Sequence, residues 1–216
     1  AAPPSVADTA ALAKLLAEQP AVGTLVKADQ NLFAFLSAVS LIHQRALPLV
    51  AALTDWLLSK ATPQPSRDAL ARALEPTQPA IGLVVSERML NTPPELIPDA
   101  YDSLLQDISW AVENEETAQL RESFRFARLL FLANVSAGAA DTDAVGDVGA
   151  KRPSKKAKRK AFDLEGLSFA RAEEEAFANL AEDHALIHGA NGADLLAFTL
   201  SMDSVRAAVP ALRDIM

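Results

Sequence analysis

Cysteine is absent from this chain, which excludes disulfide bonds, thiol catalysis and thiolate metal ligands and fits a reducing compartment. Long apolar runs are absent as well: none approaches the roughly 20 residues that a membrane-spanning helix needs. No secretory signal peptide is recognisable at the start of the sequence, whose first residue is Ala1. Half of the 216 residues are apolar, so the chain can bury a substantial core, as one domain of ordinary size or as two small ones.

Basic charge is scarce outside one short tract. The sequence carries a net charge of −8, yet residues 151–160 (KRPSKKAKRK) contain seven basic residues and no acidic ones. The rest of the chain has 13 basic against 28 acidic residues, a net charge of −15. An acidic body of this kind repels nucleic acid phosphates and attracts basic partners.

Short apolar runs between turn residues predict several strands. They cover residues 23–28, 81–85, 124–135, 162–169 and 195–200. Residues 32–42 are almost continuously apolar, and this pattern fits a buried strand as well as a buried helix.

Helical spacing of apolar residues predicts the remaining elements. They cover residues 6–18, 47–58, 66–74, 173–186 and 203–215, with a further helix that starts near Pro98. Ser66 is expected to cap the helix that it begins. Some neighbouring strands have no helix between them, so the pattern favours a mixed sheet with helices packed on it over a purely parallel fold.

The segment Ser86-Glu87-Arg88 is expected to follow the strand 81–85 and to enter a turn. Thr92 and Glu95 are placed to cap each other in a loose helical turn before Pro98. Strand ends often carry active-site residues, but no glycine-rich turn presents Ser86 as a nucleophile. The pattern therefore favours a structural ion pair between Glu87 and Arg88 over catalysis.

Two histidines four residues apart, His184 and His188, are expected on one side of the helix 173–186. Their spacing suits two zinc ligands. However, the glutamate that follows the first histidine in hydrolytic zinc helices is missing, and no third ligand is implied. We expect two solvent-facing histidines near a helix C-terminus, where the helix dipole favours them.

The same predicted helix carries an acidic face. It consists of Glu173, Glu174, Glu175, Glu182 and Asp183. Such a face is commonly solvated, and the alternative is a landing surface for a basic protein. The acidity of the whole body favours that alternative here.

Residues 137–161 are expected to form a flexible internal linker, because neither its Gly/Ala/Asp half nor its basic half can bury enough apolar surface. Residues 1–136 and 162–216 would then form one domain. The basic tract fits a nuclear import signal, with an electrostatic tether to its own domain as the alternative. It has no aromatic residue to stack on bases. Its basic residues are Lys151, Arg152, Lys155, Lys156, Lys158, Arg159 and Lys160.

Four blocks, taken together, resemble the BCCIP family, which includes the fungal Bcp proteins. The first is VGTLVKAD with NLFAFLSAVSL, residues 22–41, and the third is SFRFARLLFLANVS, residues 123–136. The second, GLVVSERMLNTPPELIPDAYDSLLQDI at residues 82–108, is the most specific. The fourth is the basic tract followed by AEEEAF at residues 172–177.

This resemblance implies an α/β fold of the acetyltransferase (GNAT) type, a mixed β-sheet with helices on both faces. It implies no enzymatic activity, no metal and no cofactor. The turn that would cradle the pyrophosphate of coenzyme A, Glu87 to Pro94, has no glycine and contains two prolines that lack amide donors.

The resemblance implies instead a nuclear chaperone that shuttles with the cytoplasm, binds a basic large-subunit ribosomal protein and assists nuclear export of a client. A protein-binding scaffold in DNA repair and cell-cycle control and a degenerate acetyltransferase are the alternatives. An import receptor would read the basic tract; membrane binding and sequence-specific nucleic acid binding are not expected. Candidate partner-binding residues are Ser86, Glu87, Arg88, Asn91, Glu173, Glu174, Glu175, Glu182 and Asp183.

Overall fold

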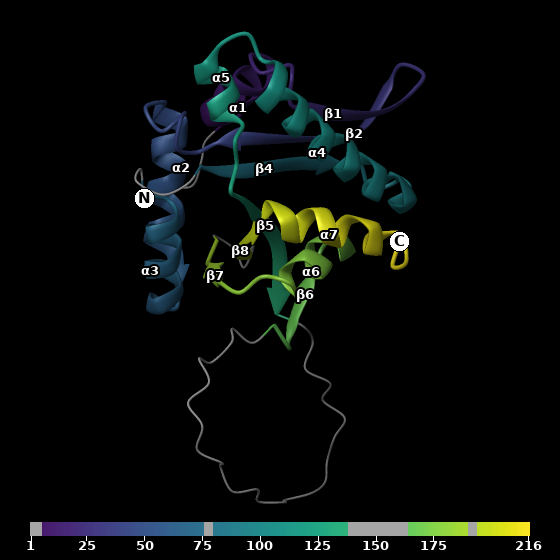
Figure 1. Ribbon diagram of the computed structural model, residues 1–216. Coiled ribbons are helices and arrows are strands. Elements are labelled where there is room, and N and C mark those ends of the chain that lie inside the picture. The colour runs from purple at the N-terminus through teal and green to yellow at the C-terminus, as the bar shows by residue number, and fades with distance from the viewer. Residues whose placement is uncertain (1–5, 76–79, 138–163, 190–193) are drawn as a thin grey trace, which may run out of the picture.

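The computed structural model describes residues 6–75, 80–137, 164–189 and 194–216 (Figure 1). The predicted linker 137–161, including the basic tract, lies outside these residues except for Ala137. The helices are α1 (Val6–Ala17), α2 (Pro48–Lys60), α3 (Gln64–Ala73), the 3-10 turn η1 (Pro94–Leu96), α4 (Ile97–Asn114), α5 (Ala118–Ser123), α6 (Ala172–Ala178) and α7 (Met202–Leu212). The strands are β1 (Gly23–Ala28), β2 (Asn31–Ser40), β3 (Ala61–Thr62), β4 (Ile81–Arg88), β5 (Arg128–Ala137), β6 (Leu167–Phe169), β7 (His184–Ile187) and β8 (Asp194–Ser201).

The strands form one mixed sheet, in the order β1-β2-β4-β5-β8-β7-β3, with β6 paired to β5. Only β4 and β5 pair in parallel among the described strands; the other pairs are antiparallel. Residues 32–42, which the sequence left open, are largely strand β2. The predicted mixed α/β sheet is therefore confirmed. Among the described helices, none combines the length and the apolar character needed to cross a membrane.

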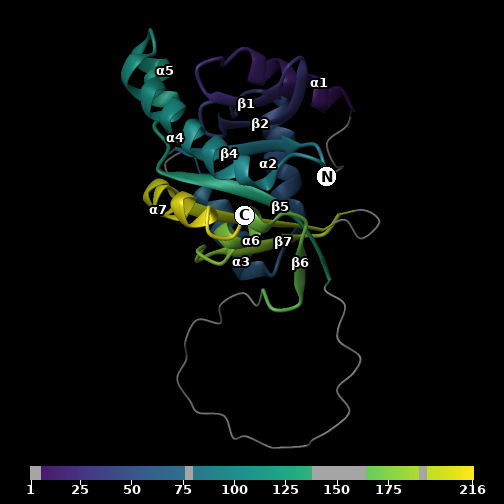
Figure 2. The same cartoon turned by 90° about the vertical axis from the view of Figure 1, so that its right-hand side faces the viewer.

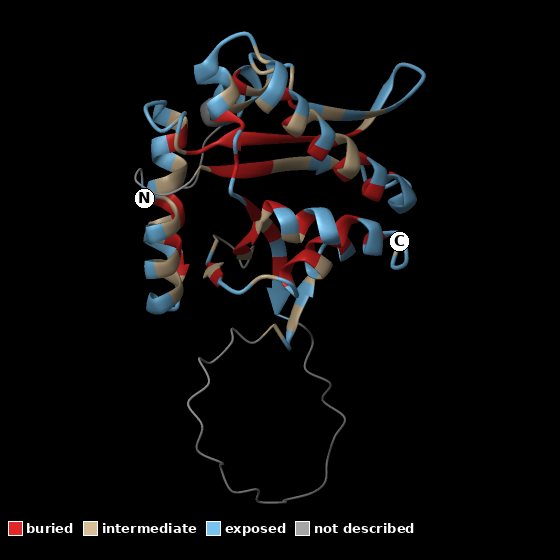
Figure 3. Ribbon diagram, in the orientation of Figure 1, coloured by how far each residue is buried: buried red, intermediate tan, exposed pale blue. Residues whose placement is uncertain are grey.

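Helices cover both faces of the sheet because its central strands are apolar on both sides. Along β5, Leu129, Phe131 and Ala133 belong to one core, whereas Leu130 belongs to the other. The first core is closed by α4, α6 and α7, and the second by α1, α2 and α3. Figure 3 shows the buried residues concentrated in the central strands and on the inner sides of these helices, and Figure 2 gives the view turned by 90°.

The start of α4 follows the sequence prediction, but its cap does not. A short turn, η1, precedes the helix, and Pro98 lies in the first helical turn, where a missing amide costs nothing. Thr92 does not cap Glu95: its hydroxyl donates to the carbonyl of Phe33 at 2.9 Å, which ties the turn to β2. Similarly, Ser66 lies inside α3, whose N-cap is Pro63.

Three predicted boundaries are wrong for tertiary reasons. Strand β4 continues to Arg88, because β2 offers it pairing partners as far as Ala34. Strand β5 begins only at Arg128, because Phe124 ends the short helix α5. The predicted helix 173–186 stops at Ala178, and the chain then returns as β7 to pair with β8.

The close packing around Gly82, near the start of β4, generates a first prediction. A β-carbon at Gly82 would lie 3.0 Å from side-chain atoms of Phe126 and Leu129, so Gly82→Ala should destabilise the fold by about 1–2 kcal/mol through overpacking. The free energy of unfolding in urea measures this effect. Gly23→Ala is the matched control, because its β-carbon would meet nothing closer than 3.7 Å. Equal stability of the two variants would contradict the prediction.

Candidate functional site

The parallel strands β4 and β5 stay paired over only three residues. Ile81, Gly82 and Leu83 face Arg128, Leu129 and Leu130, and no further pairs of these two strands follow. Beyond this point β4 runs along β2 as far as Arg88, while β5 runs along β8 and β6. The second half of β4 therefore presents an edge that β5 does not cover, and an uncovered edge needs other partners for its backbone groups.

Arg171 joins the two parted strands. The chain beside it is fixed to β5, since the amide of Ala170 donates to the carbonyl of Asn134 at 3.0 Å. Its guanidinium reaches the edge of β4, where it donates to the carbonyl of Ser86 at 3.2 Å and to the carboxylate of Glu87 at 3.1 Å. The planar fork of an arginine suits such a double contact.

A second, deeper ion pair links the end of β4 to α6. Arg88 donates to Glu173 at 3.1 Å, and the side chain of Glu173 is only 3% exposed. Arg171 also contacts the buried Glu174 at 3.4 Å. The five residues Glu87, Arg88, Arg171, Glu173 and Glu174 thus form one ionic cluster, which we call the β4–α6 cluster.

Burial raises the pKa of Glu174 to about 7, with the nearby charges of Glu173 and Glu87 adding to the rise and Arg171 and Arg88 opposing it. Tyr101 is buried as well, and its own burial, followed by the charges of Glu173 and Glu174, raises its pKa. Its ring packs edge-on against Phe177, with the ring centroids 5.0 Å apart. A glutamate with a near-neutral pKa is typical of an acid–base catalyst but also of structural ion pairs. Five hollows in the described part of the surface have linings that do not include Glu174, so the structural role fits better.

The prediction of an exposed acidic face is wrong for Glu173 and Glu174. Glu173 and Glu174 point into the protein, because α6 turns this side toward Arg88, Arg171 and Tyr101. Only Glu175, Glu182 and Asp183 are exposed, and the last two lie beyond the end of α6. The expected Glu87–Arg88 ion pair is likewise replaced by two pairs with α6 and its preceding residue.

The histidines do not share a helix face. His184 lies on β7, is buried and donates to the carbonyl of Ala178 at 2.7 Å, whereas His188 lies just past β7 and contacts Asp194 at 3.2 Å. No group of three metal-binding side chains is found among the described residues. The remaining histidine, His43, contacts Ser40 at 3.0 Å, and none of these contacts involves Ser86.

The turn after β4 has few amides to offer a phosphate. The amide of Met89 donates to Phe33 and that of Thr92 donates to Met89, while Pro93 and Pro94 have none. Anion sites at helix starts depend on several free amides that point at one place. The turn instead exposes apolar and polar side chains, among them Met89, Leu90 and Asn91.

Sequence reasoning missed Arg171, the residue that connects the cluster. Its only local signal is its place directly before the run AEEEAF, where a cation is close to three carboxylates. Its contacts with Ser86 and Glu87 span 85 and 84 residues and depend on the fold.

Comparison with known proteins places the chain in a family. The sequence profile of the BCCIP family matches residues 4–183. The protein bcp1 of Aspergillus fumigatus is 33% identical over 186 residues, which cover 84% of this chain and 59% of that protein. The protein bcp1 of Schizosaccharomyces pombe is 33% identical over 183 residues, which cover 82% of this chain and 61% of that protein. This chain belongs to the BCCIP family.

A third relative, the BCCIP homolog of Arabidopsis thaliana, is 33% identical over 132 residues, which cover 59% of this chain and 40% of that protein. The crystal structure of BCP1 from Saccharomyces cerevisiae has the same fold, with a TM-score of 0.61 at 16% identity, covering 94% of this chain and 72% of that one. None of these names designates an enzyme. The chain spans about three fifths of the length of the two bcp1 proteins.

The buried pair in the β4–α6 cluster generates a second prediction. Arg88→Met should destabilise the protein by roughly 3–5 kcal/mol, because it leaves the buried carboxylate of Glu173 without its partner. Replacing both residues by methionine should recover much of this loss, since no buried charge remains unpaired. The test is urea unfolding of Arg88→Met, Glu173→Met and the double variant. Additive losses in the double variant would show that the pair is not coupled.

The raised pKa of Glu174 generates a third prediction, about pH. The folded protein holds a proton on Glu174 up to about pH 7, whereas the unfolded chain releases it near the ordinary value of 4.5. The folded state therefore binds more protons in this window, and this contribution to stability is present below pH 4.5 and lost as pH rises through 7. As the pH rises from 4.5 to 7, the free energy of unfolding of wild type should fall by on the order of 2 kcal/mol relative to that of Glu174→Gln.

The measurement is the free energy of unfolding of both proteins at several pH values. Glu175→Gln serves as the control, because Glu175 is exposed on the same helix. Parallel pH curves for wild type and Glu174→Gln would contradict the prediction.

Proposed function

We propose that this protein binds and escorts a basic client, a ribosomal protein of the large subunit, in the nucleus, and that it performs no catalysis. The observation that carries the proposal is the separation of charge along the chain. Outside the tract 151–160 the chain has 28 acidic and 13 basic residues, a net charge of −15. Membership of the BCCIP family supports a protein-binding role of this kind.

Ribosomal proteins are rich in lysine and arginine because they contact RNA phosphates. A strongly acidic partner attracts such a protein at long range and competes with RNA for it. Charge of this kind mainly raises the rate and selectivity of association, while desolvated apolar contacts supply much of the affinity. An acidic globule with some exposed apolar or aromatic surface therefore suits a carrier of basic proteins.

The absence of enzymatic activity is supported by two features of the described residues. The turn after β4 contains two prolines, and the amides of Met89 and Thr92 already donate to backbone carbonyls within the fold. Glu174, the carboxylate with the most suitable pKa for proton transfer, is engaged with Arg171 beneath the sheet edge. Both features favour a binding protein over a degenerate acetyltransferase.

The nuclear location and the shuttling rest on the basic tract, which fits the segments that import receptors read. We include nuclear export of a client in the proposal because the family resemblance implies it. The tract lies outside the described residues, so its role is argued from its composition alone.

A binding experiment that offers separated large-subunit ribosomal proteins and, in parallel, recombination proteins tests the proposed function and is the fourth prediction. The immobilised protein should retain one or a few of them in a complex that survives physiological ionic strength, where exposed charges are screened beyond about 8 Å. Lysozyme, a basic protein foreign to the ribosome, is the control and should be lost. Retention of recombination proteins in place of ribosomal ones would favour a DNA-repair scaffold, and equal retention of lysozyme would overturn the proposal.

A further inference from the structure

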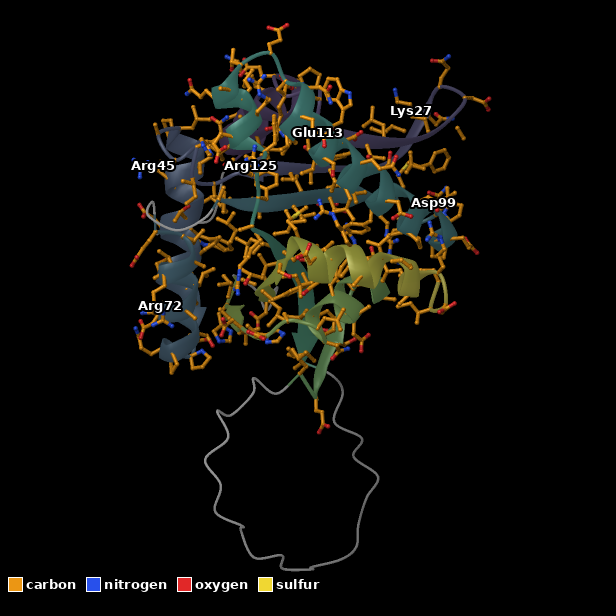
Figure 4. All side chains as sticks on the ribbon, in the orientation of Figure 1. Lys27, Arg45, Arg72, Asp99, Glu113 and Arg125 are labelled. Carbon is orange, nitrogen blue, oxygen red and sulfur yellow. The ribbon has the colours of Figure 1, made fainter. Side chains whose placement is uncertain are left out.

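We propose that the groove between α4 and α7 receives a lysine or arginine side chain of the basic client, held by the ring of Trp110 and the carboxylate of Glu113. This inference deepens the proposed function and rests on it. Figures 1 and 2 show α4 and α7 lying side by side on the same face of the sheet, and Figure 4 labels Glu113 on α4.

The groove is a shallow, open hollow in the surface. Its volume is about 450 Å³, and its lining includes Leu105, Ser109, Trp110 and Glu113 from α4 and Arg206 from α7. A second hollow of about 230 Å³ shares Ser109, Glu113 and Arg206 with the first and reaches the buried Phe126. The two hollows are therefore neighbours, and Glu113 lines both of them.

Trp110 is exposed at the wall of this groove. Its exposed fraction is 54%, compared with 7% for Trp56, the other tryptophan of the chain, which lies in the opposite core. Tryptophan is the residue most enriched at the energetic centres of protein interfaces. Its ring is also the preferred aromatic surface for a lysine or arginine cation.

Charge decides which ligand the groove suits, because its cations are already neutralised. Arg206 pairs with Asp203 at 3.5 Å and contacts the hydroxyl of Ser109. The neighbouring Arg213 and Arg125 are also paired, through Arg213–Asp99 at 2.9 Å, Arg213–Asp102 at 2.5 Å and Arg125–Glu122 at 3.1 Å.

Glu113 is different, since it makes no ion pair with any described residue. It lies three residues after Trp110, so the two side chains are neighbours on the helix surface. Both also lie near the C-terminal end of α4, where the helix dipole adds negative potential and disfavours a carboxylate. A bound cation would relieve that repulsion while it covers the ring of Trp110.

Calorimetric titration with an oligolysine peptide tests this site and is the fifth prediction. Wild type should bind saturably, and Trp110→Ala and Glu113→Gln should each weaken binding about two- to five-fold, as expected for the loss of one exposed cation–π contact or one exposed ion pair. Trp110→Phe keeps an aromatic face and should weaken binding less than Trp110→Ala does. Glu175→Gln makes the same charge change on an exposed helix outside the groove and should leave affinity nearly unchanged.

Tryptophan fluorescence gives an independent readout in wild type. Because Trp56 is buried in the other core, a change in emission on adding the peptide reports on Trp110. All of these variants change exposed residues, and their thermal melting should match wild type. Absence of saturable binding by wild type, wild-type affinity of Trp110→Ala, or equal losses in Glu113→Gln and Glu175→Gln would each overturn the proposal.

The same variants separate this proposal from the proposed function. If a ribosomal protein binds wild type and Trp110→Ala equally, the client does not use the groove, but the carrier function stands. If no ribosomal protein binds wild type while oligolysine binds through Trp110 and Glu113, the groove is a cation site and the carrier function fails.

Discussion

The fold depends on how the parting of β4 and β5 is closed. After three parallel pairs β5 leaves β4 without a neighbour on one side, in the middle of an otherwise paired sheet. Arg171 supplies a donor for the freed carbonyl of Ser86 and a partner for Glu87, and the adjacent chain is bonded to β5. This bridge and the Arg88–Glu173 pair together hold α6 against β4, and Phe177 of α6 packs against Tyr101.

Closing the gap with charges has a physical cost, which constrains what the β4–α6 cluster can do. Removing a carboxylate and a guanidinium from water costs several kcal/mol per ion, and the attraction between them often only offsets this cost. Replacing a buried ion pair by apolar side chains of similar volume is often neutral or stabilising, but apolar side chains here would leave the carbonyl of Ser86 without the donor that Arg171 supplies. What the ion pairs provide is one defined register, because Glu173 and Glu174 must meet Arg88 and Arg171 at the same time. Because its charges are already paired with one another, the β4–α6 cluster suits a rigid structural role. A client would have to bind at another surface.

Much of the fold could be predicted from the sequence, because periodicity and breakers are local signals. The apolar runs of β4 and β8 and the helix that starts near Pro98 depend on neighbouring residues and are correct. The predicted helix 173–186 is too long, because its acidic residues favour a helix locally, whereas β7 forms only by pairing with β8. No local pattern reveals that Glu173 is buried, since its partner Arg88 lies 85 residues away.

The position of the candidate site could not be predicted from the sequence either. A net charge of −15 says that basic partners are attracted but does not say where they are held. In the folded chain the carboxylates have different environments. Glu173 and Glu174 are buried, whereas Asp99, Asp102 and Asp203 pair with arginines on the surface. Glu113 has no ion-pair partner among the described residues. Only the spatial arrangement separates these groups.

In the proposed carrier function, two ranges of interaction would act on the client in different ways. The field of the whole acidic body acts over roughly a Debye length, about 8 Å at physiological salt, and it brings any basic protein near without orienting it. A contact that excludes water acts only at van der Waals distance, and it discriminates between partners by shape. Glu113 contributes to both ranges, whereas the ring of Trp110 contributes only to the second. A carrier that must release its client needs both interactions. Salt screens the long-range attraction, whereas the short-range contact sets the dissociation rate and so the lifetime of the complex.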